Sequence, residues 1–149
     1  MRLNSVIALG TLLLLASAIA PAADSKPDFS GTWKLNTAKS EGAPGSLVVK
    51  IDHKDPVFKY TASGSQDGNE FEETAELPTD GKEVTTSNGL LVKAHWDGNV
   101  LVMEYKSQDG NFAGVARHSI SEDGKTLTRD ADVKSSEGNH KEHLVLEKQ

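Results

Sequence analysis

Two arginines are the residues of this sequence whose chemistry can be localised most sharply. Arg117 and Arg129 are the only arginines apart from Arg2, and they stand on either side of Asp123-Gly124. Arg117 alternates with Ala113 and Val115. Arg129 alternates with Leu127, Ala131 and Val133. In extended chain, residues two apart share a face, so both guanidinium groups are predicted to point toward an apolar interior.

An inward guanidinium is unfavourable unless it is paired, so it meets a buried carboxylate or an anionic ligand group. We predict a ligand site formed by Arg117 and Arg129 together with Phe58, Tyr60 and Tyr105. The alternatives for the arginines are an internal salt bridge or a side chain that snorkels to the rim. The candidate partners for such a bridge are Glu73, Glu104 and Glu142.

Histidine, cysteine and serine patterns give little support to metal binding or catalysis. The sequence has no cysteine and five histidines, and no two histidines stand two apart, the spacing that a strand would use for a metal. We expect surface or rim histidines, with a single haem-ligating histidine as a minor alternative. No Gly-x-Ser-x-Gly, His-Glu-x-x-His or phosphate-binding loop occurs. We therefore expect no enzyme, no metal and no cofactor.

The elements that would position these side chains are separated by a recurring turn signal. Residues that tolerate positive φ, as tight hairpins require, recur at seven places. They are Asp67-Gly68, Asp80-Gly81, Asn88-Gly89, Asp97-Gly98, Asp109-Gly110, Asp123-Gly124 and Glu137-Gly138. Calcium loops are the alternative, but neither the EF-hand frame nor a nine-residue glycine repeat fits.

Between these turns the chain alternates apolar and polar residues with a period of two. Such segments are 47–51, 57–61, 70–77, 90–96, 100–106, 112–120, 126–133 and 140–147. This pattern predicts antiparallel strands with one buried and one wet face. The expected fold is all-β, an up-and-down meander of about eight to ten strands closed into a small barrel.

The beginning of the sequence predicts export. Arg2 precedes an apolar run over 6–20 and small residues, which is typical of a signal peptide cleaved after Ala22. The run is too short for a membrane span. We therefore expect a leader at 1–22, a short segment at 23–30, one barrel domain at 31–149, and a periplasmic or secreted location.

The net charge of the chain is −6, and it becomes −7 once Arg2 is lost with the leader. An acidic chain without a basic cluster is not expected to bind nucleic acid. Because the chain has no cysteine, disulfides are impossible and the core alone must hold the fold. A monomer is favoured.

A short stretch carries a resemblance to a known family. Asp28-Phe29-Ser30-Gly31-Thr32-Trp33-Lys34-Leu35-Asn36 resembles the opening strand of calycins, the lipocalins and fatty-acid-binding proteins, and of small exported lipocalin-like bacterial proteins. The resemblance implies a barrel whose base includes Gly31 and Trp33. Residues 37–45 are too short for the two helices of fatty-acid-binding proteins, and no Arg-x-Tyr stands on the last strand. The ligand contacts of that family are therefore not transferred.

Two functions follow from these observations. The first is an exported lipocalin-like barrel that binds a small amphipathic or hydrophobic ligand. The alternative is a structural or protein-interaction module of the cell envelope with a filled core. An aromatic content of 5% allows either a tightly packed interior or a modest cavity.

Overall fold

The computed structural model describes residues 25–149, so the predicted leader at 1–22 lies outside the described residues. Within 25–149 the chain forms ten strands and one short 3₁₀ helix, η1 (Thr37–Lys39). The strands are β1 (Gly31–Leu35), β2 (Ser46–Lys54), β3 (Val57–Gln66), β4 (Asn69–Pro78), β5 (Val84–Thr85), β6 (Leu91–Asp97), β7 (Val100–Lys106), β8 (Phe112–Ile120), β9 (Thr126–Ser135) and β10 (Gly138–Lys148). The all-β prediction is confirmed.

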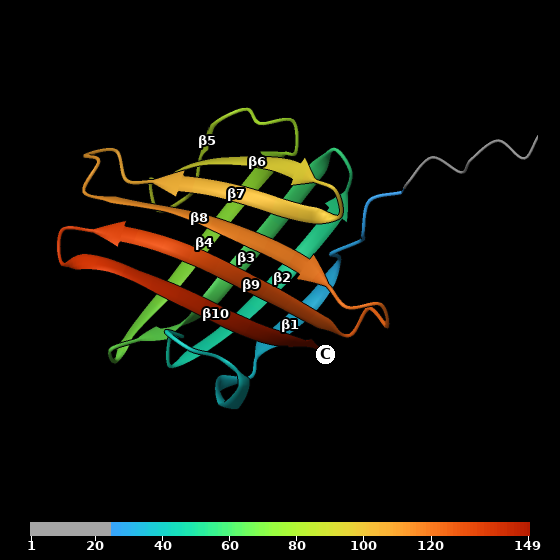
Figure 1. Ribbon diagram of the computed structural model, residues 1–149, viewed down its shortest axis with the longest axis horizontal. Helices are drawn as coiled ribbons and strands as arrows, with labels where there is room; N and C mark the ends of the chain where they lie inside the picture. The colour runs from blue at the N-terminus through green and yellow to red at the C-terminus, as the bar shows by residue number, and fades with distance from the viewer. Residues whose placement is uncertain (1–24) are drawn as a thin grey trace, which may run out of the picture.

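The ten strands form one antiparallel sheet in the order β4-β3-β2-β1-β10-β9-β8-β7-β6-β5. Figure 1 shows this sheet curled into a barrel, with β6 to β10 crossing in front of β2, β3 and β4. The edge strand β4 is joined to the segment that follows β5, where the amide of Ser87 donates to the carbonyl of Thr74 at 3.0 Å and the amide of Thr74 donates to Oγ of Ser87 at 2.8 Å. The predicted up-and-down meander is confirmed, and the barrel is nearly closed.

The seven predicted turn pairs all lie at connections between consecutive strands. Their glycines have positive φ without exception, and at the β3–β4 hairpin Asp67 has a positive φ as well. Aspartates at three of these turns also accept a backbone N–H two residues on: Asp80, Asp109 and Asp123. The turn interpretation is therefore correct, and it explains why the strands meet in sequential order.

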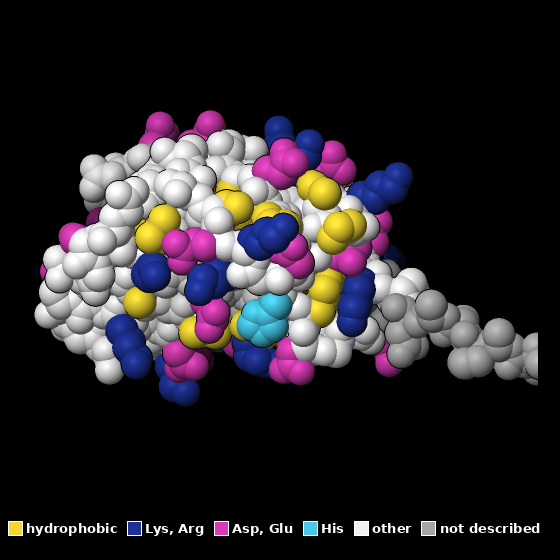
Figure 2. Space-filling model, turned by 90° about the horizontal axis from the view of Figure 1, so that it is seen from above, with side chains coloured by type: hydrophobic (Ala, Val, Ile, Leu, Met, Phe, Trp, Pro, Cys, Tyr) yellow, Lys and Arg dark blue, Asp and Glu magenta, His cyan; other side chains and the backbone are white. Residues whose placement is uncertain are grey.

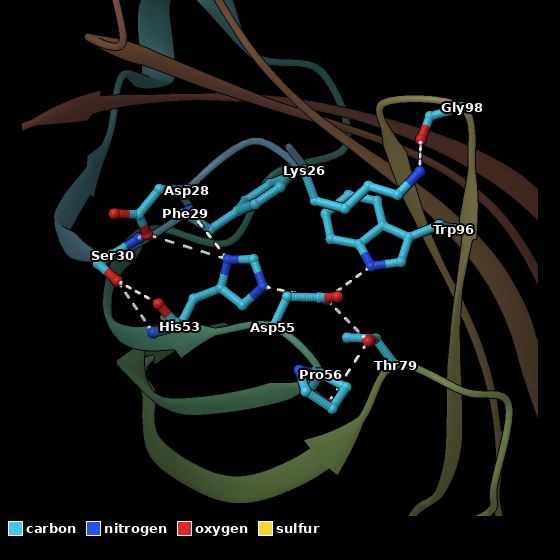
Figure 3. A network of polar contacts seen from close by, with 10 residues as sticks. All are labelled: Lys26, Asp28, Phe29, Ser30, His53, Asp55, Pro56, Thr79, Trp96 and Gly98. Atoms are coloured by element: carbon cyan, nitrogen blue, oxygen red, sulfur yellow. Dashed lines mark hydrogen bonds and ion pairs between the residues drawn. The ribbon is translucent and has the colours of Figure 1, made fainter. Parts of the chain in front are cut away.

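One end of the barrel is plugged by the segment that precedes β1. Trp33 and Phe29 are fully buried, and the Trp33 indole N–H donates to the Phe29 carbonyl at 2.8 Å. The ring of Phe29 packs edge-on against His53 and Phe58, with centroids 5.9 Å away in each case. Figure 3 shows Phe29 above His53. Phe29 precedes the first strand and is nevertheless a core residue.

The outer surface of the barrel carries mixed charge. On the face seen in Figure 2, acidic and basic side chains are interspersed and apolar side chains lie in small separate groups. Several cross-strand pairs join opposite charges, such as Lys59 with Glu76 and Lys141 with Asp132. No helix in the described part of the chain has the length and apolar character that crossing a membrane requires.

Candidate functional site

The interior of the barrel holds a cavity of about 360 Å³. Its wall is mostly apolar and comes from strands on both sides of the barrel, with Phe29 at the plugged end. Apolar lining residues include Leu47, Val49, Ile51, Phe58, Phe71, Val92, Met103, Phe112, Leu127, Leu144 and Leu146. The volume lies in the lower part of the range typical of small-molecule sites. The interior therefore contains a cavity and not the filled core that the alternative function predicts.

Tyr60 and Glu73 form the first polar group in this wall. Alternation along β3 and β4 turns both side chains inward, and the Tyr60 hydroxyl donates to Oε1 of Glu73 at 2.5 Å. The other carboxylate oxygen accepts from the Thr86 hydroxyl at 3.4 Å. Burial, then the hydrogen bond and charge of Glu73, raise the pKa of Tyr60. Tyr60 is thus a neutral donor already committed to Glu73.

Arg129 is the centre of a second polar group. Its Nη1 donates to Oε2 of Glu142, and its Nη2 donates to the Tyr105 hydroxyl at 3.2 Å. The guanidinium also lies 5.8 Å from the centroid of the Tyr105 ring, within cation–π range. The side chains of Arg129 and Glu142 are both 22% exposed. Arg129 points inward as predicted, and it forms the salt bridge to Glu142 that was the alternative to a ligand contact.

Gly114 explains how Tyr105 reaches Arg129. The two residues are paired across β7 and β8, and a Cβ placed on Gly114 would lie 2.4 Å from Cζ and Oη of Tyr105. The phenol ring therefore occupies the space that any larger residue would fill. A glycine in the middle of a strand usually marks such a close approach, so the sequence carried a signal for this contact.

His118 lines the cavity, whereas the sequence predicted a histidine at the surface or rim. It lies opposite Arg129 across β8 and β9. Its Nδ1 is 3.2 Å from the Leu101 carbonyl, which can only accept, so Nδ1 carries the proton and Nε2 is an acceptor. Burial and then the charge of Arg129 lower the pKa of His118 to about 3. The imidazole is therefore neutral at pH 7.

The inward orientation predicted for Arg117 is wrong. Its side chain is 49% exposed and pairs on the outer surface with Asp97 through a 2.6 Å hydrogen bond. The alternation that suggested otherwise rests on Val115, which is itself 40% exposed. The inward row of β8 is Phe112, Gly114, Ala116, His118 and Ile120. Its large apolar residues stand at the two ends of the strand, whereas the prediction for Arg117 rested only on the near neighbours Ala113 and Val115, which lie on the outer face.

The other residues predicted for the ligand site line the cavity, and the two predicted for the barrel base lie apart from it. Phe58, Tyr60 and Tyr105 line the cavity. Trp33 lies at the plugged end and does not line it, and Gly31 adopts φ +136°, where a Cβ would meet Cε of Lys148 at 2.7 Å. Glu104, one of the three candidate partners for the arginines, is exposed on the outer face.

A second cluster of titratable groups, at the plugged end, is structural (Figure 3). The buried His53 accepts the Phe29 amide at Nδ1, 3.2 Å away, and its Nε2 faces Asp55 at 3.6 Å. Ser30 bonds to the backbone of His53, not to its ring. Ser30, His53 and Asp28 therefore lack the hydroxyl–imidazole contact that a nucleophile needs. They fasten the plug to the β2–β3 hairpin.

Among known proteins, the similarity lies in structure. No protein-family model matches this chain, and no curated protein sequence matches it. The zebrafish ileal bile acid-binding protein complexed with cholic acid superposes with a TM-score of 0.57 at 18% identity, covering 81% of this chain and 98% of that chain. A point mutant of the fluorescent protein UnaG superposes with a TM-score of 0.54 at 18% identity, covering 81% of this chain and 96% of that chain. These likenesses show that the chain shares the β-barrel fold of these two proteins.

Proposed function

We propose that this protein is an exported barrel that binds one small amphipathic or hydrophobic molecule in its cavity and catalyses no reaction. The observation that carries the proposal is the 360 Å³ cavity, whose mostly apolar wall is interrupted by two polar groups, Tyr60–Glu73 and Arg129–Glu142. Apolar walls with a few placed polar groups are typical of small-molecule sites. The cholic acid held by a similarly folded protein supports this reading.

Export is the second part of the proposal. It is supported by the charged start, the apolar run and the small residues of the first 22 positions. Periplasm and extracellular space are both compatible with such a barrel. The location is tested by fractionating cells that express the full-length chain and sequencing the N-terminus of the recovered protein. Intact Met1 in the cytoplasmic fraction would contradict it.

Ligand binding is tested with Nile red, an uncharged fluorophore that brightens in apolar surroundings. We expect saturable fluorescence with the purified protein and loss of most of it in Ala62→Phe, because Ala62 lines the cavity and a phenyl ring would fill part of it. Ala113→Phe is the matched control, since Ala113 lies in an outer groove of β8 with Val115. Equal binding by both variants would place the dye outside the barrel and reject the proposal.

A further inference from the structure

The charges inside the cavity do not balance. Of the residues that line it, Glu73 and Glu142 are carboxylates, Arg129 is the one fixed cation, and His118 is neutral at pH 7. Arg129 is already bound to Glu142 and Tyr105. In the described part of the chain Glu73 forms hydrogen bonds only with the hydroxyls of Tyr60 and Thr86 and no ion pair. The interior thus carries one uncompensated negative charge.

This excess of negative charge disfavours the binding of an anionic ligand. A fatty acid or another carboxylate would place a third negative charge near one guanidinium, in surroundings where charges interact more strongly than in water. To bind Arg129 it would have to displace Glu142, which would then keep only the exposed His140 as a partner. The cavity therefore disfavours the carboxylate end of an amphiphile.

The cavity also has unused acceptors. Nε2 of His118 has no hydrogen-bond partner among residues 25–149. Each oxygen of Glu73 accepts a single hydroxyl, whereas a carboxylate offers about four lone-pair sites. The polar part of a ligand that satisfies these groups must donate hydrogen bonds, and a positive charge on it would neutralise Glu73.

We propose that the cavity takes a single-chain amphiphile with a protonated amine as its head, with Glu73 as the counter-ion and apolar chain against the barrel wall. This inference rests on the proposed function and specifies its ligand class. An alkylammonium has three donors and no acceptor, as the lysine head does, so it fits an interior that offers acceptors and excess negative charge.

The test compares three ligands that share a ten-carbon chain: decylamine, decanol and decanoate, each titrated at pH 7 against the protein loaded with Nile red. We expect decylamine to displace the dye at a concentration about tenfold below decanol, and decanoate to be weaker than both, since charge-assisted bonds are roughly twice as strong as neutral ones. If decanoate displaces the dye at as low a concentration as decylamine does, the inference is overturned and the proposed function stays intact. Failure of Nile red and of all three ligands to bind would overturn the proposed function itself.

Variants locate the effect at one carboxylate. Glu73→Gln keeps an oxygen that accepts from Tyr60 and removes the charge. We therefore expect the affinity for decylamine to fall about tenfold and the affinity for decanol to stay unchanged. Glu72→Gln is the matched control, because Glu72 is the exposed neighbour on the outer face of β4. An equal loss of decylamine affinity in both variants, or in neither, would overturn the role of Glu73.

Discussion

His118 on β8 stands directly opposite Arg129 on β9, and both side chains enter the cavity. Burial and the neighbouring guanidinium disfavour a charged imidazole, and together they outweigh the hydrogen bond from His118 to the Leu101 carbonyl. The pair therefore divides its roles: Arg129 holds the positive charge and binds Glu142, while His118 stays neutral and keeps a free lone pair. We therefore expect this pair to influence both the pH dependence of stability and the ligand preference of the cavity.

The first prediction concerns stability against pH. The pKa of His118 is about 3 in the folded protein and about 6.5 in the unfolded chain, so the unfolded chain binds the extra proton between these values. The free energy of unfolding must therefore fall as pH drops below 6.5, by up to about 1.4 kcal/mol per pH unit from this group. Urea denaturation at pH 7, 6 and 5 measures it.

His118→Gln is the control for that experiment, because the amide does not titrate. We expect its unfolding free energy to depend less on pH between 7 and 5 than that of the unsubstituted protein. The aspartates with lowered pKa, such as Asp28 and Asp123, lose their stabilisation only below about pH 4 and do not contribute in this window. Parallel pH profiles for the two proteins would show that His118 titrates normally.

The second prediction separates the two arginines. Arg129→Ala leaves the mostly buried Glu142 with only the exposed His140 as a partner, so we expect the free energy of unfolding to fall by about 2 kcal/mol. Arg117→Ala removes an exposed pair, and we expect no measurable change in the urea midpoint. Equal losses in the two variants would mean that the inner pair contributes no more than a surface pair.

The backbone of this fold was predictable because its signals are local. Asp67-Gly68 and its counterparts allow few conformations, and the period-two pattern of β4, with Phe71, Ala75 and Leu77 on one face, leaves one way to bury the strand. Only β5, two residues long, had no pattern to detect.

The polar interior was only partly predictable, because orientation on a strand is read from apolar neighbours. Arg129 has Leu127 and Ala131 beside it, both buried, and its inward orientation followed. On β8 the inward row has its large apolar residues, Phe112 and Ile120, only at the strand ends, so the apolar neighbours nearest to Arg117, among them the exposed Val115, indicated the wrong face. The partner of Arg129 also depends on β10 lying beside β9, and no local sequence signal shows which strand pairs with β9. The sequence therefore could not distinguish among Glu73, Glu104 and Glu142.

The third prediction tests the close approach at Gly114. In Gly114→Ala the new methyl group would overlap the Tyr105 ring and push its hydroxyl away from Arg129. We expect a loss of about 1–3 kcal/mol in urea unfolding, the usual range for an overpacked interior. Gly45→Ala is the matched control, since its nearest contact is 3.4 Å and its φ is not positive. A Gly114→Ala protein as stable as the control would show that Tyr105 has room to move.

The last prediction reverses the charge preference of the cavity. Glu142 occupies Arg129, so Glu142→Gln should release the guanidinium and bring the interior to an even balance of one cation and one carboxylate. A carboxylate ligand could then bind Arg129 as a bidentate partner. We expect decanoate to displace Nile red at a concentration about tenfold lower than in the unsubstituted protein, with decanol unchanged.

The exposed Glu104 provides the control for this gain, as Glu104→Gln removes one charge outside the cavity. Its decanoate affinity should stay at the unsubstituted value, because exposed charges at that distance are screened by water and salt. If Glu104→Gln improves decanoate binding as much as Glu142→Gln does, the net charge of the protein decides the preference. If Glu142→Gln improves it alone, the cavity excludes carboxylates because Glu142 already holds Arg129.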